Sequence, residues 1–173
     1  MISGYLVFMG LYLCGLVIRI GYELLKKRGR IDTESKTIFF VVLAAMCLLW
    51  VGWFSLCSLD PFRLAIPDVV RWVGLGIFLM GSGLAFGAFF QLRGMENITR
   101  LATTGVFAKL RHPMYTGFIL WILGWAIYHG AGVSLVFGFV GIGNILYWRR
   151  LEEETLELRY GEEYRRYRQT TWF

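Results

Sequence analysis

The sequence has little charge, little proline and little cysteine. Only 17% of its 173 residues are charged, whereas about a quarter is usual for a soluble domain, and 57% are hydrophobic. Three prolines leave long stretches in which no residue interrupts a helix. The cysteines form no Cys-x-x-Cys pair, which argues against a disulfide framework or a metal site and places all three in the apolar core (Cys14, Cys47 and Cys57). We therefore expect one integral-membrane domain over residues 1–173.

Five apolar stretches are long enough, or nearly long enough, to cross a bilayer as helices, which takes about 20 residues. They are Gly4–Leu25, Ile38–Leu59, Ile66–Phe90, Met114–Tyr128 and Val133–Trp148. The last two are separated by only four residues and predict a short helical hairpin. The third is rich in glycine, which favours close helix packing in lipid. The predicted fold class is all-α, a polytopic membrane bundle of about five transmembrane helices followed by a C-terminal helix along the membrane surface.

The basic residues predict the topology. A net charge of +6 could suit nucleic acid, but the cations fall in clusters between the apolar stretches, which indicates lipid headgroups and no nucleic acid. With five spans, fifteen of the 18 Lys and Arg residues share one side, Arg19 lies within a span, and only Arg63 and Arg71 lie opposite. The positive-inside rule then places the N-terminus outside and the tail in the cytoplasm. The sequence gives no sign of an obligate protein partner.

Two polar clusters flank the last two apolar stretches. KLRHPMYTG (109–117) precedes the fourth, and WRRLEEETLELRYGEEYRRY (148–167) begins at the end of the fifth. Each alone fits membrane anchoring, the first as a basic helix start with proline and the second as a salt-bridged surface helix. The hairpin, however, returns both clusters to one edge of the membrane. We therefore expect His112, Tyr115, Arg149 and Glu153 to converge, which is more than anchoring requires.

Together the two clusters resemble a known family. TTGVFAKLRHPMYTG followed by RLEEETLELRYGEEYRRY is similar to the isoprenylcysteine carboxyl methyltransferase and phospholipid methyltransferase family, small membrane enzymes that use S-adenosyl-L-methionine. The resemblance covers roughly residues 91–167. It implies three N-terminal spans in residues 1–90, a cofactor-binding and catalytic core in 91–173, and a lipid-like or prenylated methyl acceptor in the bilayer.

The resemblance also implies roles for particular residues. Those that match cofactor contacts are Gln91 (if one residue is inserted), Thr99, Arg100, Leu101, Ala102, Phe107, His112, Pro113, Met114, Tyr115 and Glu153. The implied catalytic residues are Arg149, for an anionic substrate head, and an acidic pair. Counting forward from the arginine makes the pair Glu153 and Glu154, whereas counting back from Gly161 makes it Glu152 and Glu153. Glu153 is the first choice and Glu152 the second.

The chain departs from the family pattern in two places. It has Gly105-Val106-Phe107 where Gly-Pro-Tyr is usual, and its tail RQTTWF lacks the usual prolines. These differences concern the shape of the loop and tail that would cover the cofactor.

The methyl acceptor stays open at this stage. A prenylcysteine carboxylate is preferred, and a phospholipid amine is the alternative; a sterol-type membrane reductase using NADPH is a further one. A non-catalytic subunit or transporter would need polar residues at mid-membrane, where only Ser82, Asn144 and Arg19 are candidates. The lipid chain is expected to enter sideways between helices, near the glycine-rich third stretch.

Overall fold

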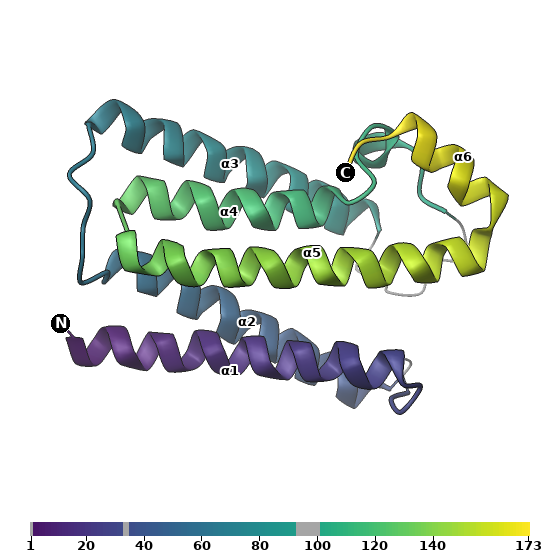
Figure 1. Cartoon of the computed structure of the whole chain (residues 1–173), viewed down its shortest axis with the longest axis horizontal. Coiled ribbons are helices and arrows are strands. Elements are labelled where there is room, and N and C mark those ends of the chain that lie inside the picture. The colour runs from purple at the N-terminus through teal and green to yellow at the C-terminus, as the bar shows by residue number, and fades with distance from the viewer. Residues whose placement is uncertain (1, 33–34, 93–100) are drawn as a thin grey trace.

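A computed structural model describes residues 2–32, 35–92 and 101–173 (Figure 1). The described residues form six α-helices and one short 3₁₀ helix, η1, besides two isolated backbone bridges. In chain order these are α1 (Ile2–Lys27), α2 (Lys36–Ser58), α3 (Asp68–Gln91), η1 (Gly105–Ala108), α4 (Pro113–His129), α5 (Gly132–Tyr160) and α6 (Glu162–Thr170). The predicted all-α class is confirmed.

Each predicted span corresponds to a helix of the bundle. Four helices, α1, α2, α3 and α5, are long and apolar enough to cross a membrane. The fifth, α4, has 17 residues, which is the lower limit for a span and corresponds to about 25 Å. It lies between α3 and α5 in Figure 1. The chain is therefore a polytopic helical membrane bundle, and its helices alternate in direction so that the ends of α1, α3 and α5 and the starts of α2 and α4 meet at one end.

That end, called the basic end below, carries most of the described lysines and arginines. Arg63 and Arg71 lie at the opposite end, beside the α4–α5 turn. Arg71 Nη1 donates to the Tyr128 carbonyl at 3.3 Å, and Arg63 Nη1 donates to the His129 carbonyl at 3.5 Å. The clusters that the sequence assigned to one face of the membrane are thus together in space.

The glycines of α3 close the seam between α3 and α4. A Cβ placed on Gly117 of α4 would lie 2.6 Å from the Gly81 carbonyl oxygen, and one on Gly124 would lie 2.5 Å from the Phe78 nitrogen. The two backbones are therefore in direct contact, as the small-residue pattern predicted. The same contact leaves no space for a lipid chain between α3 and α4.

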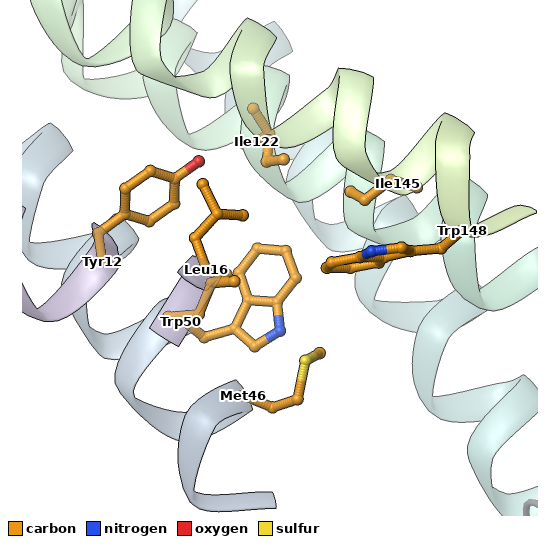
Figure 2. A pocket seen from close by; sticks show the side chains of 9 residues that line it. Tyr12, Leu16, Met46, Trp50, Ile122, Ile145 and Trp148 are labelled. Atoms are coloured by element: carbon orange, nitrogen blue, oxygen red, sulfur yellow. The ribbon is translucent and has the colours of Figure 1, made fainter. Parts of the chain in front are cut away.

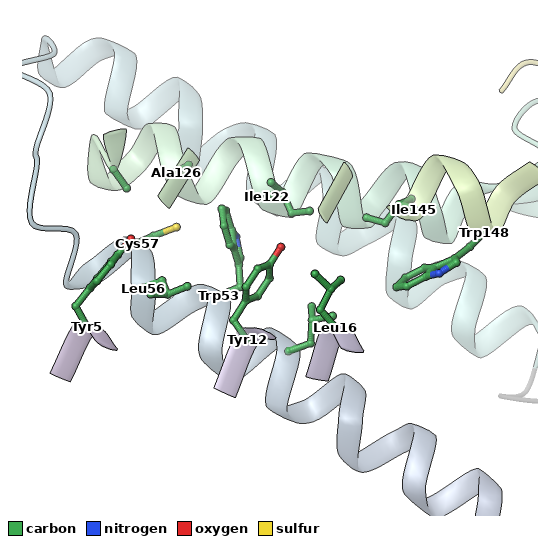
Figure 3. Packing of buried hydrophobic residues seen from close by; sticks show 12 residues of the cluster. Tyr5, Tyr12, Leu16, Trp53, Leu56, Cys57, Ile122, Ala126, Ile145 and Trp148 are labelled. Atoms are coloured by element: carbon green, nitrogen blue, oxygen red, sulfur yellow. The ribbon is translucent and has the colours of Figure 1, made fainter. Parts of the chain in front are cut away.

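A buried core joins the pair α1–α2 to the pair α4–α5 (Figure 3). Trp53 is fully buried, and its ring fills the space over Gly138 of α5. Tyr12 stacks obliquely on Trp53 and donates from its hydroxyl to the Phe137 carbonyl at 3.2 Å. Of the three cysteines only Cys57 lies in this core. The prediction was wrong for Cys14 and Cys47, which are exposed, because helices in lipid also turn apolar side chains outward.

The α4–α5 hairpin forms as predicted, and Asp60 fixes its turn. This buried carboxylate accepts hydrogen bonds from Ser134 N at 2.6 Å, Phe62 N at 2.8 Å and Val133 N at 3.4 Å. It therefore caps the start of α5 from the end of α2. Gly130 supplies the left-handed residue that ends α4 (φ 63°).

The tail differs from the prediction of a separate surface helix after Trp148. Instead α5 continues without a break to Tyr160. Charged pairs four residues apart (Arg150–Glu154, 3.5 Å) support the helix after its apolar part, and no glycine or proline lies between Trp148 and Tyr160. The chain reverses at Gly161, and α6 folds back beside the basic end (Figure 1). The last residues then pair with the loop before α4: Trp172 N donates to the Lys109 carbonyl at 2.8 Å, and Arg111 N to the Trp172 carbonyl at 3.0 Å.

Candidate active site

The site forms where α4 begins. Pro113 occupies the first turn of α4, where its missing N–H has no intrahelical partner to lose, and it is fully buried. His112 immediately precedes it, and its carbonyl accepts Thr116 N at 2.9 Å. The His112 side chain is only 3% exposed. The start of α4 thus holds an imidazole inside the basic end.

The imidazole of His112 lies between two carboxylates of α5. Its Nε2 is 3.3 Å from Glu153 Oε1, and its Nδ1 is 3.6 Å from Glu152 Oε2. Glu152 and Glu153, the pair given by counting back from Gly161, therefore reach opposite edges of one ring. Glu154, which the forward count included, pairs instead with Lys27 and Arg150.

Glu153 has two further cationic neighbours. Arg111 Nε is 3.3 Å from Glu153 Oε1, and Arg149 Nε is 3.9 Å from the same oxygen. Arg111 also binds the tail, because its Nη1 donates to the Thr171 carbonyl at 2.8 Å and to the Arg168 carbonyl at 3.1 Å. The sequence assigned Arg111 to anchoring, but in the structure it joins the acidic pair to the folded-back tail.

Tyr115 and Glu152 form the side of the cluster nearest α1. The Tyr115 ring stacks on His112 with centroids 5.6 Å apart. Crowding by the neighbouring helices raises the pKa of the Glu152 carboxyl, but hydrogen bonds from His112 and Tyr115 and the nearby Lys26 outweigh this and hold it below its ordinary value. Since 46% of the Glu152 side chain remains exposed, solvent screens these interactions.

Gln91, which was predicted to contact the cofactor, hydrogen-bonds the protein backbone in this structure. Its side-chain Nε2 donates to the Thr104 carbonyl at 2.7 Å, and its Oε1 accepts Val106 N at 3.1 Å. Phe107 is buried, and its carbonyl accepts the Tyr167 hydroxyl at 2.6 Å. Together α3 and α6 therefore hold η1 from two sides, without the proline of the usual pattern.

The other predicted residues are distributed around this loop. Leu101 and Ala102 are half-buried before η1, and Met114 is half-buried in the first turn of α4. Thr99 and Arg100 lie outside the described residues.

Arg149 faces the tail. Its guanidinium carbon lies 4.5 Å from the centre of the Phe173 ring, and its buried Nε has no hydrogen-bond partner among the described residues. The Tyr164 hydroxyl of α6 is also buried without one. Burial raises the pKa of Tyr164 to about 12, and the neighbouring Glu153 carboxylate adds to this effect. Two polar groups beside Glu153 thus remain available to a ligand.

These groups fit S-adenosylmethionine in chemical type. An amino acid moiety with one amino and one carboxylate group finds carboxylates and cations side by side here, and aromatic rings (Tyr115, Phe107) lie close to the start of α4. The buried Tyr164 hydroxyl, which has no hydrogen-bond partner among the described residues, is the observation that supports such a ligand.

Sequence reasoning missed the contribution of α1. Lys27 Nζ lies 3.7 Å from Glu154 Oε2, and the Arg19 guanidinium lies 4.7 Å from the centre of the Trp148 ring. The sequence indicated only that Arg19 lies within the first span, four residues before Glu23. Their separation from α5 by more than a hundred residues hid the contact, although two opposite charges one turn apart in a span already indicate a polar neighbourhood.

A small apolar cavity of about 10 Å³ lies near this contact (Figure 2). It is lined by Tyr12, Leu16, Met46, Leu49, Trp50, Ile122, Gly141, Ile145 and Trp148. A cavity of this volume has room for about one water molecule, so it holds no lipid chain in this conformation.

Membrane-length helices with a cluster of buried ionisable groups at one end are the architecture of an integral-membrane enzyme. A sequence model of the phospholipid methyltransferase family matches residues 69–163, which is more than half of the chain and includes His112, Glu152 and Glu153. The chain therefore belongs to the phospholipid methyltransferase family. It is a multi-pass membrane methyltransferase.

A curated relative agrees with this assignment. The protein-S-isoprenylcysteine O-methyltransferase of Dictyostelium discoideum is 23% identical over 179 residues, which cover 94% of this chain and 75% of that protein. No solved structure matches.

Proposed function

We propose that the protein transfers the methyl group of S-adenosyl-L-methionine to the carboxylate of an isoprenylcysteine-type acceptor held in the membrane. The observation that carries this proposal is the His112–Glu152–Glu153 cluster, with Arg111 and Arg149 around Glu153, at the basic end of a membrane bundle. The name of the Dictyostelium relative supports the choice of acceptor.

The cofactor supplies an electrophilic methyl group on a cationic sulfur. Glu152 and Glu153 offset positive charge and accept hydrogen bonds from an amino group. His112 and Arg111 set the positions of these two carboxylates, while Tyr115 and Phe107 offer aromatic surface to an adenine. The main contribution of the protein is alignment of donor and acceptor, an effect that can reach about 7–11 kcal/mol.

The chemistry of the acceptor distinguishes the two methyltransferase alternatives. A carboxylate is already ionised at neutral pH and needs no base, and its charge suits the Arg149 guanidinium, whose buried Nε has no hydrogen-bond partner among the described residues. A phospholipid amine would have to lose a proton to a glutamate and would gain nothing from a nearby arginine. The family name keeps the amine as the second candidate. The comparisons give no support to a sterol-type reductase.

The orientation belongs to the same proposal. Because the basic end carries most of the described cations, we place it in the cytoplasm and the N-terminus outside. The cofactor would then bind from the cytoplasm and the acceptor from the membrane.

The test uses the purified full chain in lipid nanodiscs with labelled S-adenosylmethionine. N-acetyl-S-farnesylcysteine and phosphatidylethanolamine are offered separately, and NADPH binding is measured in parallel. We expect label in a base-labile methyl ester of the farnesylcysteine. Label only in the phospholipid would establish the amine alternative, and binding of NADPH without S-adenosylmethionine binding would overturn methyl transfer altogether.

A further inference from the structure

Arg19 is an ionisable side chain inside a membrane-length helix. It lies two turns before the end of α1, its side chain is only 11% exposed, and it pairs with Glu23 one turn later, which is equally buried. Glu23 is its only ion-pair partner among the described residues. A charge at such a position is costly in lipid and is by default a sign of function.

Arg19 lies where the apolar cavity meets the polar cluster. Leu16, one turn earlier on α1, lines the cavity together with Trp148 of α5 (Figure 2). The Arg19 guanidinium covers the Trp148 ring, and Trp148 is followed within two turns by Arg149, Glu152 and Glu153. A molecule with its chain in the cavity and its head in the cluster therefore has to pass Trp148 and Arg19.

Trp148 provides a second sign of a ligand. Its side chain is 4% exposed, yet its buried Nε1 has no hydrogen-bond partner among the described residues. A buried donor without an acceptor is costly, so such a donor is normally paired. An oxygen-rich head group beside Arg19 would satisfy this donor as well.

Among the described helices, two pairs are in backbone contact, whereas the seam between these pairs is filled by side chains. Backbone contact closes α3 against α4, and Gly15 and Gly52 bring α1 and α2 equally close, since a Cβ on either would lie 2.6 Å from a backbone atom of the other helix. The seam between α1–α2 and α4–α5 is instead filled by side chains, including Met46 and Trp50. Rotation of the flexible Met46 side chain can enlarge this cavity without moving a helix.

We propose that Arg19 binds the anionic head group of a membrane-embedded methyl acceptor. Glu23 orients Arg19 over the Trp148 ring. The apolar chain of the acceptor occupies the seam lined by Leu16, Met46 and Trp50. The proposal rests on the proposed methyl transfer and adds a substrate site on α1 to it. The anion is a carboxylate of a prenylated acceptor or a phosphate of a phospholipid. Both accept two parallel hydrogen bonds from a guanidinium.

In this proposal Arg19 contacts the head group of the acceptor from the membrane side, and Arg149 contacts it from the side of the His112–Glu152–Glu153 cluster. A carboxylate has lone pairs enough for both guanidinium groups. For a phospholipid the phosphate would lie at Arg19, and its amine would extend towards the glutamates.

The experiment measures acceptor binding and methyl transfer separately, with the full chain in nanodiscs. The probes are N-acetyl-S-farnesylcysteine and phosphatidylethanolamine, each titrated without cofactor and then used as substrate. Arg19→Gln should raise the Kd and the KM for one of these probes at least about tenfold, a loss of 1.4 kcal/mol, while the Kd for S-adenosylmethionine stays within about twofold. The affected probe identifies the carboxylate or the phosphate as the ligand. Trp148→Phe, which keeps the ring and removes Nε1, should also raise the Kd for that probe.

Two controls separate binding from structural support. Exchanging the charges (Arg19→Glu with Glu23→Arg) preserves the ion pair and displaces the cation by one turn, so it should not restore the KM. Arg71→Gln removes a similar ion-paired arginine (3.9 Å from Asp68) at the opposite end and should change neither constant.

The possible failures are distinguishable. A wild-type KM and Kd in Arg19→Gln, full restoration by the charge exchange, or no binding of either probe by the wild-type protein would each overturn the role of Arg19. Normal acceptor binding that depends on Arg19, with no methyl transfer, would instead overturn the proposed function and leave the anion site in place.

Discussion

The two ring nitrogens of His112 contact consecutive glutamates, with Nε2 3.3 Å from Glu153 and Nδ1 3.6 Å from Glu152. A neutral imidazole donates from one nitrogen and accepts at the other, whereas two ionised carboxylates only accept. Each ring nitrogen therefore contacts one carboxylate, and the ring lies between the two. The ring keeps two like charges apart, and its loss would disturb both.

The first prediction follows from this contact. His112→Ala should weaken S-adenosylmethionine binding at least about tenfold, or 1.4 kcal/mol, because the two carboxylates lose the group that positions them. Calorimetric titration of the purified protein measures the change. The matched control is His129→Ala at the opposite end, where the ring packs edge-on against Trp125, and this variant should bind S-adenosylmethionine as the wild type does. Equal affinities in wild type and His112→Ala would favour the anchoring interpretation of this segment.

The second prediction concerns pH. Because the pKa of Glu152 is lower in the folded protein than its ordinary value of 4.5, the ionised carboxylate stabilises the fold above that pH. This stabilisation should be lost as the pH falls through the lower, folded pKa. Thermal unfolding between pH 3 and 7 should therefore show a steeper acid decline for wild type than for Glu152→Gln, by a small amount because the side chain is partly exposed. Glu154→Gln, in the same turn, is the control, and identical profiles for wild type and Glu152→Gln would contradict the argument.

The third prediction tests the closed seam between α3 and α4. Gly117→Ala places a methyl group 2.6 Å from the Gly81 carbonyl oxygen, so the backbones must separate. We expect a loss of about 1–3 kcal/mol in unfolding free energy, as for other overpacked sites. Gly83→Ala, also on α3 but with no described atom within 4 Å of its Cβ, should be neutral or slightly stabilising. Similar stabilities for the two variants would mean that α3 and α4 are not in backbone contact in the membrane.

The fourth prediction concerns orientation. In a chain with Cys14, Cys47 and Cys57 replaced by serine, cysteines introduced singly at the exposed Ser3 and Thr170 report the two faces of the membrane. An impermeant thiol reagent should label Ser3→Cys from outside intact cells and Thr170→Cys only after permeabilisation. The opposite pattern at either position would contradict the proposed topology.

The arrangement of helices was predictable from the sequence because lipid imposes a length on each apolar stretch. All five predicted spans became helices, and the four-residue gap at 129–132 became the hairpin turn. The end of α5 was not predictable in this way, since the change from apolar to charged residues at Trp148 does not end a helix. Gly161, thirteen residues later, supplies the positive φ (51°) at which the chain reverses.

The candidate site was predictable only in part. Chain order brought His112 and the acidic pair to one end, and their contact follows from the hairpin. The contributions of Arg111 and Lys27 depend on how α1 and the tail pack against α5, for which the sequence has no local signal, whereas Arg19 and Glu23 indicated a polar neighbourhood without identifying its partner on α5. Gln91 shows the opposite case, because its position matched the family pattern while its amide hydrogen-bonds the backbone around Gly105.

The fifth prediction separates substrate binding by Arg149 from simple support of α5. An exposed pair four residues apart contributes about 0.3–0.5 kcal/mol, so its loss alone should barely change the enzyme. Arg150 provides the matched case, since it pairs with Glu154 at the same spacing but is 79% exposed. Arg149→Ala should lower turnover at least about tenfold with cofactor affinity largely kept, whereas Arg150→Ala should leave turnover unchanged.

Two further variants define the role of the pair. Arg149→Lys should restore activity only partly, because lysine keeps the charge and loses the planar two-donor fork. Glu153→Gln should lower cofactor affinity as well as turnover, since it weakens the contacts with His112 and Arg111 and removes the charge that faces the cofactor. These effects on turnover should be larger for a carboxylate acceptor than for an amine, which gains nothing from Arg149. Full activity in both Arg149→Ala and Glu153→Gln would show that this part of α5 is a solvated helix with no part in the reaction.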